Sequence, residues 1–179
     1  MNITENDVIP GLLEVSLDVH VDDRGSFTEI FQAEKLRAGG LPEWFRPVQT
    51  NISTNKGRGV TRGIHAEPWN KYITPIAGKV FVAIVDLRTD NFGKVATFEL
   101  KYGQGLFVPK GCGNSYQTLT EDVFYLYHVD DHWQAGLSYP SINAFDETLA
   151  INWPIGKSEA IVSDKDQLNP PLSETELIK

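Results

Sequence analysis

Acid–base chemistry is best supported by His65 and Lys71, which lie in the segment GVTRGIHAEPWNK (residues 59–71). Imidazole exchanges a proton near neutral pH, and an ammonium group stabilises negative charge that develops during a reaction. If this segment begins as a strand, Arg62 points to one side, whereas Gly63 and His65 point to the other. His65 then shares its face with small residues, which leaves room for a ligand. A structural histidine bonded to the backbone fits the same pattern, and Lys71 alone fits an exposed lysine.

Two further segments contain residues that could line a site. Residues 103–114 (GQGLFVPKGCGN) place a strand before a Pro-Lys-Gly turn, which is typical of the rim of a β-barrel mouth but also fits a simple hairpin. Residues 123–129 (VFYLYHV) place Tyr125 and Tyr127 on one face of a strand, where ordinary core aromatics fit equally well. We expect the single cysteine, Cys112, to be a small packing residue, because no neighbouring feature argues for a reactive thiolate.

The elements that must position these residues are mostly strands. Alternating or continuous apolar patterns predict strands, separated by Gly, Pro, Asn and Asp, over residues 11–19, 27–31, 79–86, 94–100, 105–108 and 123–129. Residues 22–25 (DDRG) predict a turn. Strands at such spacing are typical of a β-sandwich or β-barrel.

Helices are expected to be few and peripheral. A short helix is predicted over residues 32–38, where a Gly-Gly pair follows it, and a second near residues 173–177, where Ser173 and Glu176 have the spacing of a capping box. The irregular stretch from residue 130 to residue 179 is expected to wrap the sheet. No repeat or flexible linker divides the chain, so residues 1–179 are interpreted as a single domain.

Composition excludes several classes of protein. Sixteen Lys and Arg against 24 Asp and Glu give a net charge of −8, and no basic run follows a phosphate backbone, so we expect no nucleic-acid partner. No long apolar run indicates a membrane span, and no signal peptide is recognisable. With one cysteine and therefore no internal disulfide, a cytoplasmic location is the simplest interpretation.

The glycine, histidine and proline positions resemble the two motifs of the cupin superfamily. Gly59, His65 and Gly78 resemble the first motif, and residues 103–111 resemble the second. The resemblance implies a mainly β fold, the cupin-type double-stranded β-helix or jelly-roll barrel, with a few short peripheral helices. Metal-binding cupins need further histidines and a glutamate that converge on the ion. Ala66 or Glu67 and Asn114 occupy those positions here, so no metal site is expected.

Within the cupins, the chain resembles the dTDP-4-dehydrorhamnose 3,5-epimerase family over nearly its whole length. Ordered motifs carry this resemblance: Asp23-Arg24-Gly25 with Phe27 and Glu29; Gln49, Asn51 and Ser53; Arg62-Gly63-Ile64-His65; Val85-Asp86-Leu87-Arg88 with Phe92-Gly93; Val108-Pro109; Tyr127; Ile151-Asn152-Trp153-Pro154; and Ser163-Asp164-Lys165-Asp166. The short HAEPWNK loop resembles a subgroup of that family.

The resemblance implies epimerisation, without a cofactor, at C3 and C5 of a nucleotide-linked 4-keto-6-deoxy sugar. Such a reaction needs a base, a group that stabilises the enolate, and an acid on the opposite face. The family implies His65 as the base, Asp166 as its partner, Lys71 as the enolate stabiliser and Tyr127 as the proton donor. It also implies a homodimer in which the N-terminal strand packs on the partner.

Substrate contacts follow from the same resemblance. The implied residues are Arg24, Phe27, Glu29, Gln49, Asn51, Arg62, Asn114 and Trp133. Two of them depart from the family pattern: Asn114 stands where a histidine is frequent, and Trp133 stands where a second tyrosine is common. Asn114 and the short loop suggest one alternative, a mono-epimerase acting on C3 or C5 of a related nucleotide sugar. Two alternatives from other classes are a non-catalytic sugar-binding cupin and a metal-dependent cupin oxygenase.

Overall fold

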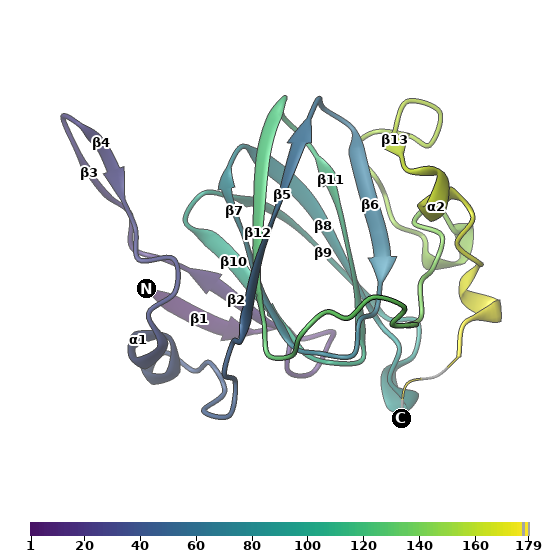
Figure 1. Ribbon diagram of the computed structural model, residues 1–179, viewed down its shortest axis with the longest axis horizontal. Coiled ribbons are helices and arrows are strands. Elements are labelled where there is room, and N and C mark those ends of the chain that lie inside the picture. Colours follow the sequence, from purple (N-terminus) through teal and green to yellow (C-terminus); the bar gives the residue numbers. More distant parts are fainter. Residues whose placement is uncertain (177, 179) are drawn as a thin grey trace.

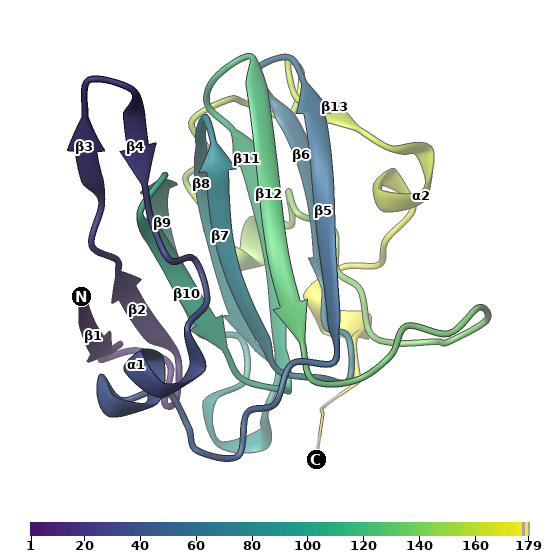
Figure 2. The same cartoon turned by 60° about the vertical axis from the view of Figure 1, so that its left-hand side comes forward.

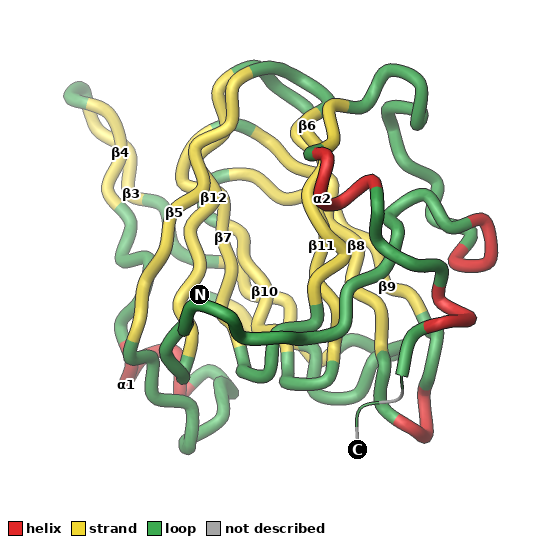
Figure 3. The backbone as a smooth tube through the Cα atoms, turned by 45° about the vertical axis from the view of Figure 1, so that its right-hand side comes forward, coloured by secondary structure: helices red, strands yellow, loops and turns green. Residues whose placement is uncertain are grey.

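Two β-sheets enclose the interior of the molecule in the computed structural model, which describes residues 1–176 and residue 178 (Figure 1). The six-stranded sheet has the order β1 (Asn2–Glu5), β2 (Leu13–Ser16), β10 (Gln104–Val108), β7 (Lys71–Ala77), β12 (Asp122–Val129) and β5 (Gln49–Lys56). The five-stranded sheet has the order β13 (Ile161–Val162), β6 (Val60–His65), β11 (Cys112–Thr118), β8 (Lys79–Asp86) and β9 (Val95–Lys101). Short helical elements lie at the periphery (Figure 3): α1 (Ala33–Ala38), α2 (Asp164–Gln167), η1 (Thr89–Asn91), η2 (Glu147–Leu149) and η3 (Leu172–Glu174).

The main core lies between the two sheets. Ile73 and Leu106 from the six-stranded sheet pack in one cluster with Val82 and Ile84 from the five-stranded sheet, and all four are fully buried. Strand β8 reads as a nearly continuous apolar run because both of its faces are covered. The sequence-based expectation of a mainly β fold with few, short, peripheral helices is therefore confirmed, and five of the six predicted strand segments overlap described strands, namely β2, β10, β12, β8 and β9.

The outer face of the five-stranded sheet is covered by the segment that follows β12, as expected (Figure 1). Ile142, Ala144 and Leu149 from this segment pack against Val85 and Leu87 at the end of β8. Ile142 in this segment exchanges both backbone hydrogen bonds with Ile64 on β6, each 3.0 Å long, which ties the segment to the sheet. Its last part carries α2, which the sequence analysis did not predict as a helix.

A second cluster covers the outer face of the six-stranded sheet. Helix α1, predicted over residues 32–38, places buried Leu36 against Phe107 and Tyr72. The prediction of a strand over residues 27–31 is wrong, because β4 (Gly25–Phe27) ends at Phe27, where the predicted strand was to begin. The chain then turns back toward the sheet because Phe31 packs against Tyr72, with ring centroids 6.0 Å apart.

The helix predicted near residues 173–177 is also wrong for the residues that are described, and residue 177 lies outside them. Residues 172–174 form a single turn, η3, and Thr175 has extended dihedral angles. The backbone N–H of Ile178 donates to Leu87 O at 3.0 Å, so Ile178 pairs beside the end of β8, and this pairing overrides the capping-box pattern. No helix in the described part of the chain is long and apolar enough to span a membrane.

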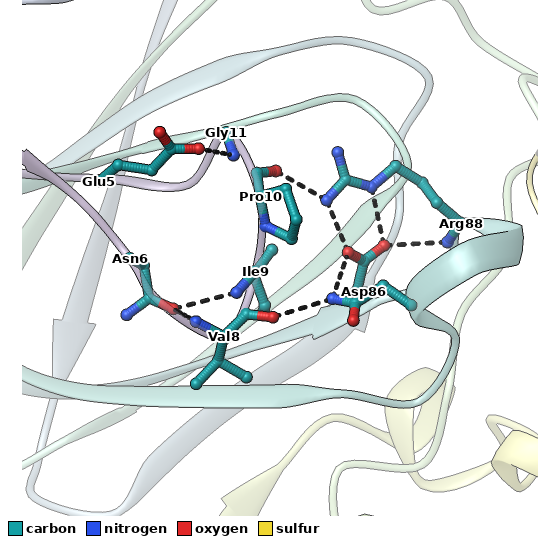
Figure 4. Close-up of polar contacts among 9 residues, drawn as sticks. Glu5, Asn6, Val8, Ile9, Pro10, Gly11, Asp86 and Arg88 are labelled. Atoms are coloured by element: carbon teal, nitrogen blue, oxygen red, sulfur yellow. Dashed lines mark hydrogen bonds and ion pairs between the residues drawn. The ribbon is translucent and has the colours of Figure 1, made fainter.

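A polar cluster fastens the N-terminal loop to the barrel (Figure 4). The Arg88 guanidinium donates to both carboxylate oxygens of the fully buried Asp86, at 2.8 and 2.6 Å, and to Pro10 O at 2.8 Å. Asn91 Nδ2 donates to Asp86 Oδ2 at 3.0 Å. Burial alone would raise the pKa of Asp86, but these donors outweigh it and hold the pKa below its ordinary value.

A two-stranded hairpin, β3 (His20–Asp22) and β4, projects away from the barrel (Figure 2). Its turn falls on Asp23 and Arg24, inside the segment predicted to turn. All six strand residues of the hairpin are exposed, including the side chains of Val21 and Phe27. The hairpin therefore presents apolar and charged groups to its surroundings and not to the core of its own chain.

Candidate active site

A cavity of about 480 Å³ opens between the two sheets. Polar and aromatic side chains from both sheets and from the covering loops line it: Gln49, Asn51, Ser53, Arg62, His65, Glu67, Trp69, Lys71, Asn114, Tyr116, Tyr125, Tyr127, Trp133, Tyr139 and Asp166. All four residues expected to be catalytic are among them. Five of the eight expected substrate contacts line the same cavity, so most of the predicted site is brought together.

His65 and Asp166 form a hydrogen-bonded pair although they are far apart in sequence. His65 Nε2 lies 2.8 Å from Asp166 Oδ1, and the backbone N–H of Gly63 donates to Asp166 Oδ2 at 3.1 Å. Ser163, the residue that caps α2, accepts a hydrogen bond from Asp166 N at 3.1 Å and fixes the start of the helix.

The electrostatics of this pair favour a charged aspartate and an oriented imidazole. Burial raises the pKa of Asp166, but the hydrogen bonds from His65 and Gly63 outweigh it, so the pKa lies below its ordinary value. An ionised carboxylate accepts the hydrogen on Nε2, which leaves the lone pair on Nδ1 of His65. That lone pair can accept a proton from a bound molecule.

A β-bulge brings Arg62 to the same cavity as His65, so the predicted opposite orientation of these residues is wrong. Asn114 pairs with His65, and Tyr116 pairs with Arg62. Between these two pairs β6 advances by three residues and β11 by only two, so β6 contains one extra residue. The extra residue changes the alternation of side chains. At Gly63 (φ +101°), an added Cβ would lie 2.6 Å from Asn114 O, so the bulge needs glycine.

Lys71 is held by a carboxylate that the sequence analysis did not assign to the site. The Lys71 side chain is 3% exposed and forms an ion pair with Glu67, whose side chain is 16% exposed. Asn70 fixes the connecting loop, because its side chain and backbone donate to Asp130 at 2.7 and 2.8 Å and its Oδ1 accepts from Lys110 N at 2.8 Å. The ammonium group is therefore positioned without the freedom of a surface lysine.

Tyr127 lies on β12, opposite Asn51 on β5. Burial is the main cause that raises the pKa of Tyr127 above its ordinary value. The phenol is thus a hydroxyl at neutral pH and can donate a proton or a hydrogen bond. Tyr125, two residues earlier, reaches the same cavity and stacks on Tyr116 with ring centroids 4.1 Å apart.

One wall of the cavity is built by the alternation of β5. Gln49, Asn51 and Ser53 are spaced by two residues and all line the cavity, while Thr50 and Ile52 are exposed on the other face. Gln49 Nε2 donates to Asn51 Oδ1 at 2.9 Å, and Gln49 Oε1 accepts from the Trp133 backbone N–H at 3.0 Å. This wall can orient hydroxyl groups through neutral donors and acceptors.

Three expected substrate contacts do not reach this cavity. Arg24 is exposed and pairs with Asp22 at 2.6 Å, Phe27 is 65% exposed, and Glu29 forms an ion pair with Lys35. All three lie on or just after the β3–β4 hairpin, which projects from the barrel (Figure 2), and none of them lines the cavity.

Six lining residues were not assigned to the site from the sequence: Ser53, Glu67, Trp69, Tyr116, Tyr125 and Tyr139. Spacing offered a signal for two of them, because Ser53 continues the alternation of β5 and Tyr125 shares a face with Tyr127. Nothing in the sequence pattern pointed to Tyr139, which belongs to the irregular segment after β12. Its ring packs edge-on against His65, with ring centroids 6.1 Å apart. Among residues 1–176 and 178, no group of three metal-ligating side chains converges. That the reaction needs no metal stays a prediction.

Comparison with known proteins identifies the family. A family model described as dTDP-4-dehydrorhamnose 3,5-epimerase matches residues 6–174. The chain belongs to this family. The "Protein RmlC homolog" of Streptococcus pyogenes is 42% identical over 178 residues, which cover 96% of this chain and 89% of the relative.

Solved structures of family members have the same fold. RmlC from Streptococcus suis, in complex with dTDP-D-xylose, is 38% identical with a TM-score of 0.94, covering 99% of this chain and 94% of that one. The epimerase RmlC from Legionella pneumophila, in complex with dTDP-4-keto-L-rhamnose, is 28% identical with a TM-score of 0.89, covering 99% and 98%. The cupin-type jelly-roll barrel expected from the sequence is thereby confirmed, and this member of the epimerase family is an isomerase.

Proposed function

We propose that this epimerase-family member inverts C3 and C5 of dTDP-4-dehydro-6-deoxyglucose to give dTDP-4-dehydrorhamnose, with His65 as the base. The observation that carries the proposal is the His65–Asp166 pair, which shares one cavity with Lys71 and Tyr127. The bound nucleotide sugars of the S. suis and L. pneumophila relatives support this substrate class.

The chemistry of the substrate fits one base and one acid. C3 and C5 flank the C4 ketone, so each C–H is acidic, and in the gluco chair both hydrogens are axial on the same face of the ring. Nδ1 of His65 takes the proton, and the C–H electron pair forms the enolate, whose charge rests on O4. The Lys71 ammonium stabilises that charge. Tyr127 returns a proton to the same carbon from the opposite face, which inverts it.

Each cycle leaves the sugar with the same atoms and the same oxidation state. The proton that His65 removes is balanced by the proton that Tyr127 gives, and exchange with solvent resets both groups. No electron acceptor is consumed, which supports the proposal that the reaction needs no cofactor. The ionised Asp166 stabilises the imidazolium that exists between the two steps.

The nucleotide diphosphate needs positive charge that this cavity does not supply by itself. The charged lining residues are two cations, Arg62 and Lys71, and two carboxylates, Glu67 and Asp166, which cancel. Arg24 provides a further guanidinium on the projecting hairpin, together with the exposed ring of Phe27. We therefore propose a homodimer in which the hairpin of one chain, including Glu29 at its base, contacts the nucleotide bound by the other.

Mixed dimers test this sharing of residues. Each dimer combines one His65→Ala subunit with one Arg24→Ala subunit. If the hairpin serves the partner, one of the two cavities in the mixed dimer has both defects and the other has none, so activity exceeds that of either pure variant. Activity no higher than the better pure variant contradicts the shared site.

Deuterium incorporation from D₂O into dTDP-4-dehydro-6-deoxyglucose, followed by NMR, tests the main proposal. We expect exchange at C3 and C5 with the wild-type protein and none with His65→Ala, whereas the exposed control His132→Ala exchanges both positions. Wild-type protein that binds the nucleotide sugar without exchanging either proton contradicts the proposal and indicates a binding protein. A cytoplasmic location, where nucleotide sugars are made, accompanies the proposal.

A mono-epimerase is the second candidate, and Trp133 is the observation that favours it. Its indole lines the cavity but has no group that releases a proton at physiological pH. If inversion at one of the two carbons needs a second acid at this position, the protein inverts only the other carbon. Exchange at a single carbon in the same NMR experiment identifies this outcome.

A further inference from the structure

Three buried polar side-chain atoms in the cavity have no hydrogen-bond partner within the described part of the chain: Asn114 Oδ1, Tyr125 Oη and Trp69 Nε1. Tyr125 is 1% exposed and Trp69 is 5% exposed. Most buried polar atoms in proteins are paired, because leaving one unpaired is costly. Unpaired atoms that line a cavity therefore indicate groups that a ligand satisfies.

Asn114 and Tyr125 offer the complementary halves of one interaction. Asn114 Oδ1 only accepts, whereas Tyr125 Oη can donate. Burial raises the pKa of Tyr125 well above its ordinary value, and the nearby Asn114 amide opposes the rise only in part. The phenol therefore keeps its hydrogen at neutral pH. Trp69 Nε1 only donates and cannot replace the acceptor.

The strand register places this pair beside the base. Asn114 on β11 is the residue directly opposite His65 on β6, and opposite residues project their side chains to the same face. Tyr125 comes from β12 in the other sheet, two residues before Tyr127. A sugar carbon that presents its hydrogen to His65 therefore has its neighbouring substituent next to Asn114.

We propose that Asn114 and Tyr125 form a subsite for one sugar hydroxyl, the C2 hydroxyl of the hexose. The hydroxyl donates to Asn114 Oδ1 and accepts from Tyr125 Oη, so both buried atoms are paired. This inference rests on the proposed function and names a specificity determinant for it: the subsite selects 2-hydroxy sugars against 2-deoxy sugars.

The chemistry of the substrate leaves the C2 hydroxyl as the group to be bound. C6 is a methyl group, O1 is joined to the diphosphate, and O4 is the enolate oxygen that Lys71 stabilises. The C3 hydroxyl moves when C3 inverts, so a fixed pair of protein atoms cannot hold it throughout the reaction. C2 adjoins C3 and does not invert, which keeps its hydroxyl beside the base in substrate, enolate and product.

Two substrates and three variants test the subsite. The substrates are dTDP-4-dehydro-6-deoxyglucose and its 2-deoxy analogue, and the readouts are kcat/KM for solvent exchange and Kd by titration calorimetry. The variants are Asn114→Leu, Tyr125→Phe and the control Tyr72→Phe. Tyr72 Oη is also buried without a partner among the described residues, but Tyr72 packs in the cluster outside the cavity.

We expect the wild-type protein to prefer the 2-hydroxy substrate by about 10- to 100-fold, the size associated with leaving buried polar groups unpaired. Asn114→Leu and Tyr125→Phe each reduce this preference to less than about threefold, because they lower kcat/KM and weaken binding for the 2-hydroxy substrate only. Tyr72→Phe keeps the full preference. If the two residues serve only folding, their variants lower kcat/KM equally for both substrates, and that result overturns the proposal.

The two readouts separate this inference from the proposed function. If neither sugar exchanges but the wild-type protein still binds the 2-hydroxy sugar more tightly than the 2-deoxy sugar, epimerisation is refuted and the subsite stands. If both sugars exchange with equal kcat/KM and bind with equal Kd, epimerisation stands and the subsite is refuted. Equal binding without exchange refutes both.

Discussion

Replacing Asp166 with asparagine removes one hydrogen-bond acceptor from a position where the structure uses two. The carboxylate accepts from His65 Nε2 at 2.8 Å and from the buried Gly63 N–H at 3.1 Å. A carboxamide has only one oxygen, and its NH₂ group must face the other partner. The backbone N–H cannot turn away or lose its hydrogen, so it takes the oxygen, and the NH₂ group faces His65.

The consequence is the wrong imidazole tautomer. Nε2 must now accept, so the hydrogen moves to Nδ1, and the lone pair that serves as the base is lost. A wrong tautomer in a Ser-His-Asp triad lowers kcat about 10⁴-fold, and we expect a loss of about 10³- to 10⁴-fold in the solvent-exchange rate of Asp166→Asn. The Kd for the nucleotide sugar should change by less than about threefold, because Asp166 acts through His65.

The assay is deuterium exchange at C3 and C5 under single-turnover conditions, with Asp164→Asn as the matched control. Asp164 begins the same helix, is exposed and does not line the cavity, so its variant should keep wild-type rates. A loss of less than about tenfold in Asp166→Asn would refute the assigned tautomer, since such a small effect is compatible with a base that works without its aspartate.

The same variant changes the response to acid. The pKa of Asp166 in the folded protein lies below that of the unfolded chain, so its ionisation stabilises the fold above the unfolded pKa. This stabilisation is lost as the pH falls below about 4 toward the folded pKa. We therefore expect the free energy of unfolding of Asp166→Asn, measured in urea, to vary less with pH in this acid range than that of the wild type.

Three other substitutions test the clamp, by which we mean the Asp86–Arg88 cluster, the proposed proton donor Tyr127, and the β-bulge at Gly63. Arg88→Met leaves buried Asp86 with fewer donors, so we expect urea denaturation at neutral pH to give a loss of about 3 kcal/mol, recovered in part as acid protonates Asp86; a loss below about 1 kcal/mol would contradict the clamp. Tyr127→Phe removes the proton donor, so we expect inversion to fall about 10²-fold or more in an NMR product assay; unchanged product formation would assign the acid elsewhere. Gly63→Ala places a Cβ against Asn114 O at positive φ, so we expect about 1–3 kcal/mol of destabilisation by urea denaturation; wild-type stability would argue against the bulge geometry.

The sequence was informative where function depends on local pattern. The apolar run of residues 79–86 predicted strand β8, whereas Gln49 and Asn51 on β5 came from the family motifs and not from a predicted strand. Residue types and the family motifs singled out His65, Lys71, Tyr127 and Asp166, which line one cavity.

Long-range pairing decided what the sequence analysis missed. The orientation of Arg62 was wrong because alternation assumes a regular strand, and the bulge in β6 is visible only in its register with β11. The predicted helix near residue 173 failed because Ile178 pairs with Leu87, the residue after β8. Tyr139 reaches His65 from an irregular segment, where no periodicity exists to be read.

The bulge at Gly63 links these local and long-range features to the proposed chemistry. In a regular strand, either Arg62 or His65 faces the cavity, but not both. One extra residue places the guanidinium and the imidazole together, and the Gly63 N–H that it exposes donates to Asp166, which orients the imidazole. Glycine at this position therefore acts on the base twice, through the space that its missing side chain leaves for β11 and through its backbone N–H.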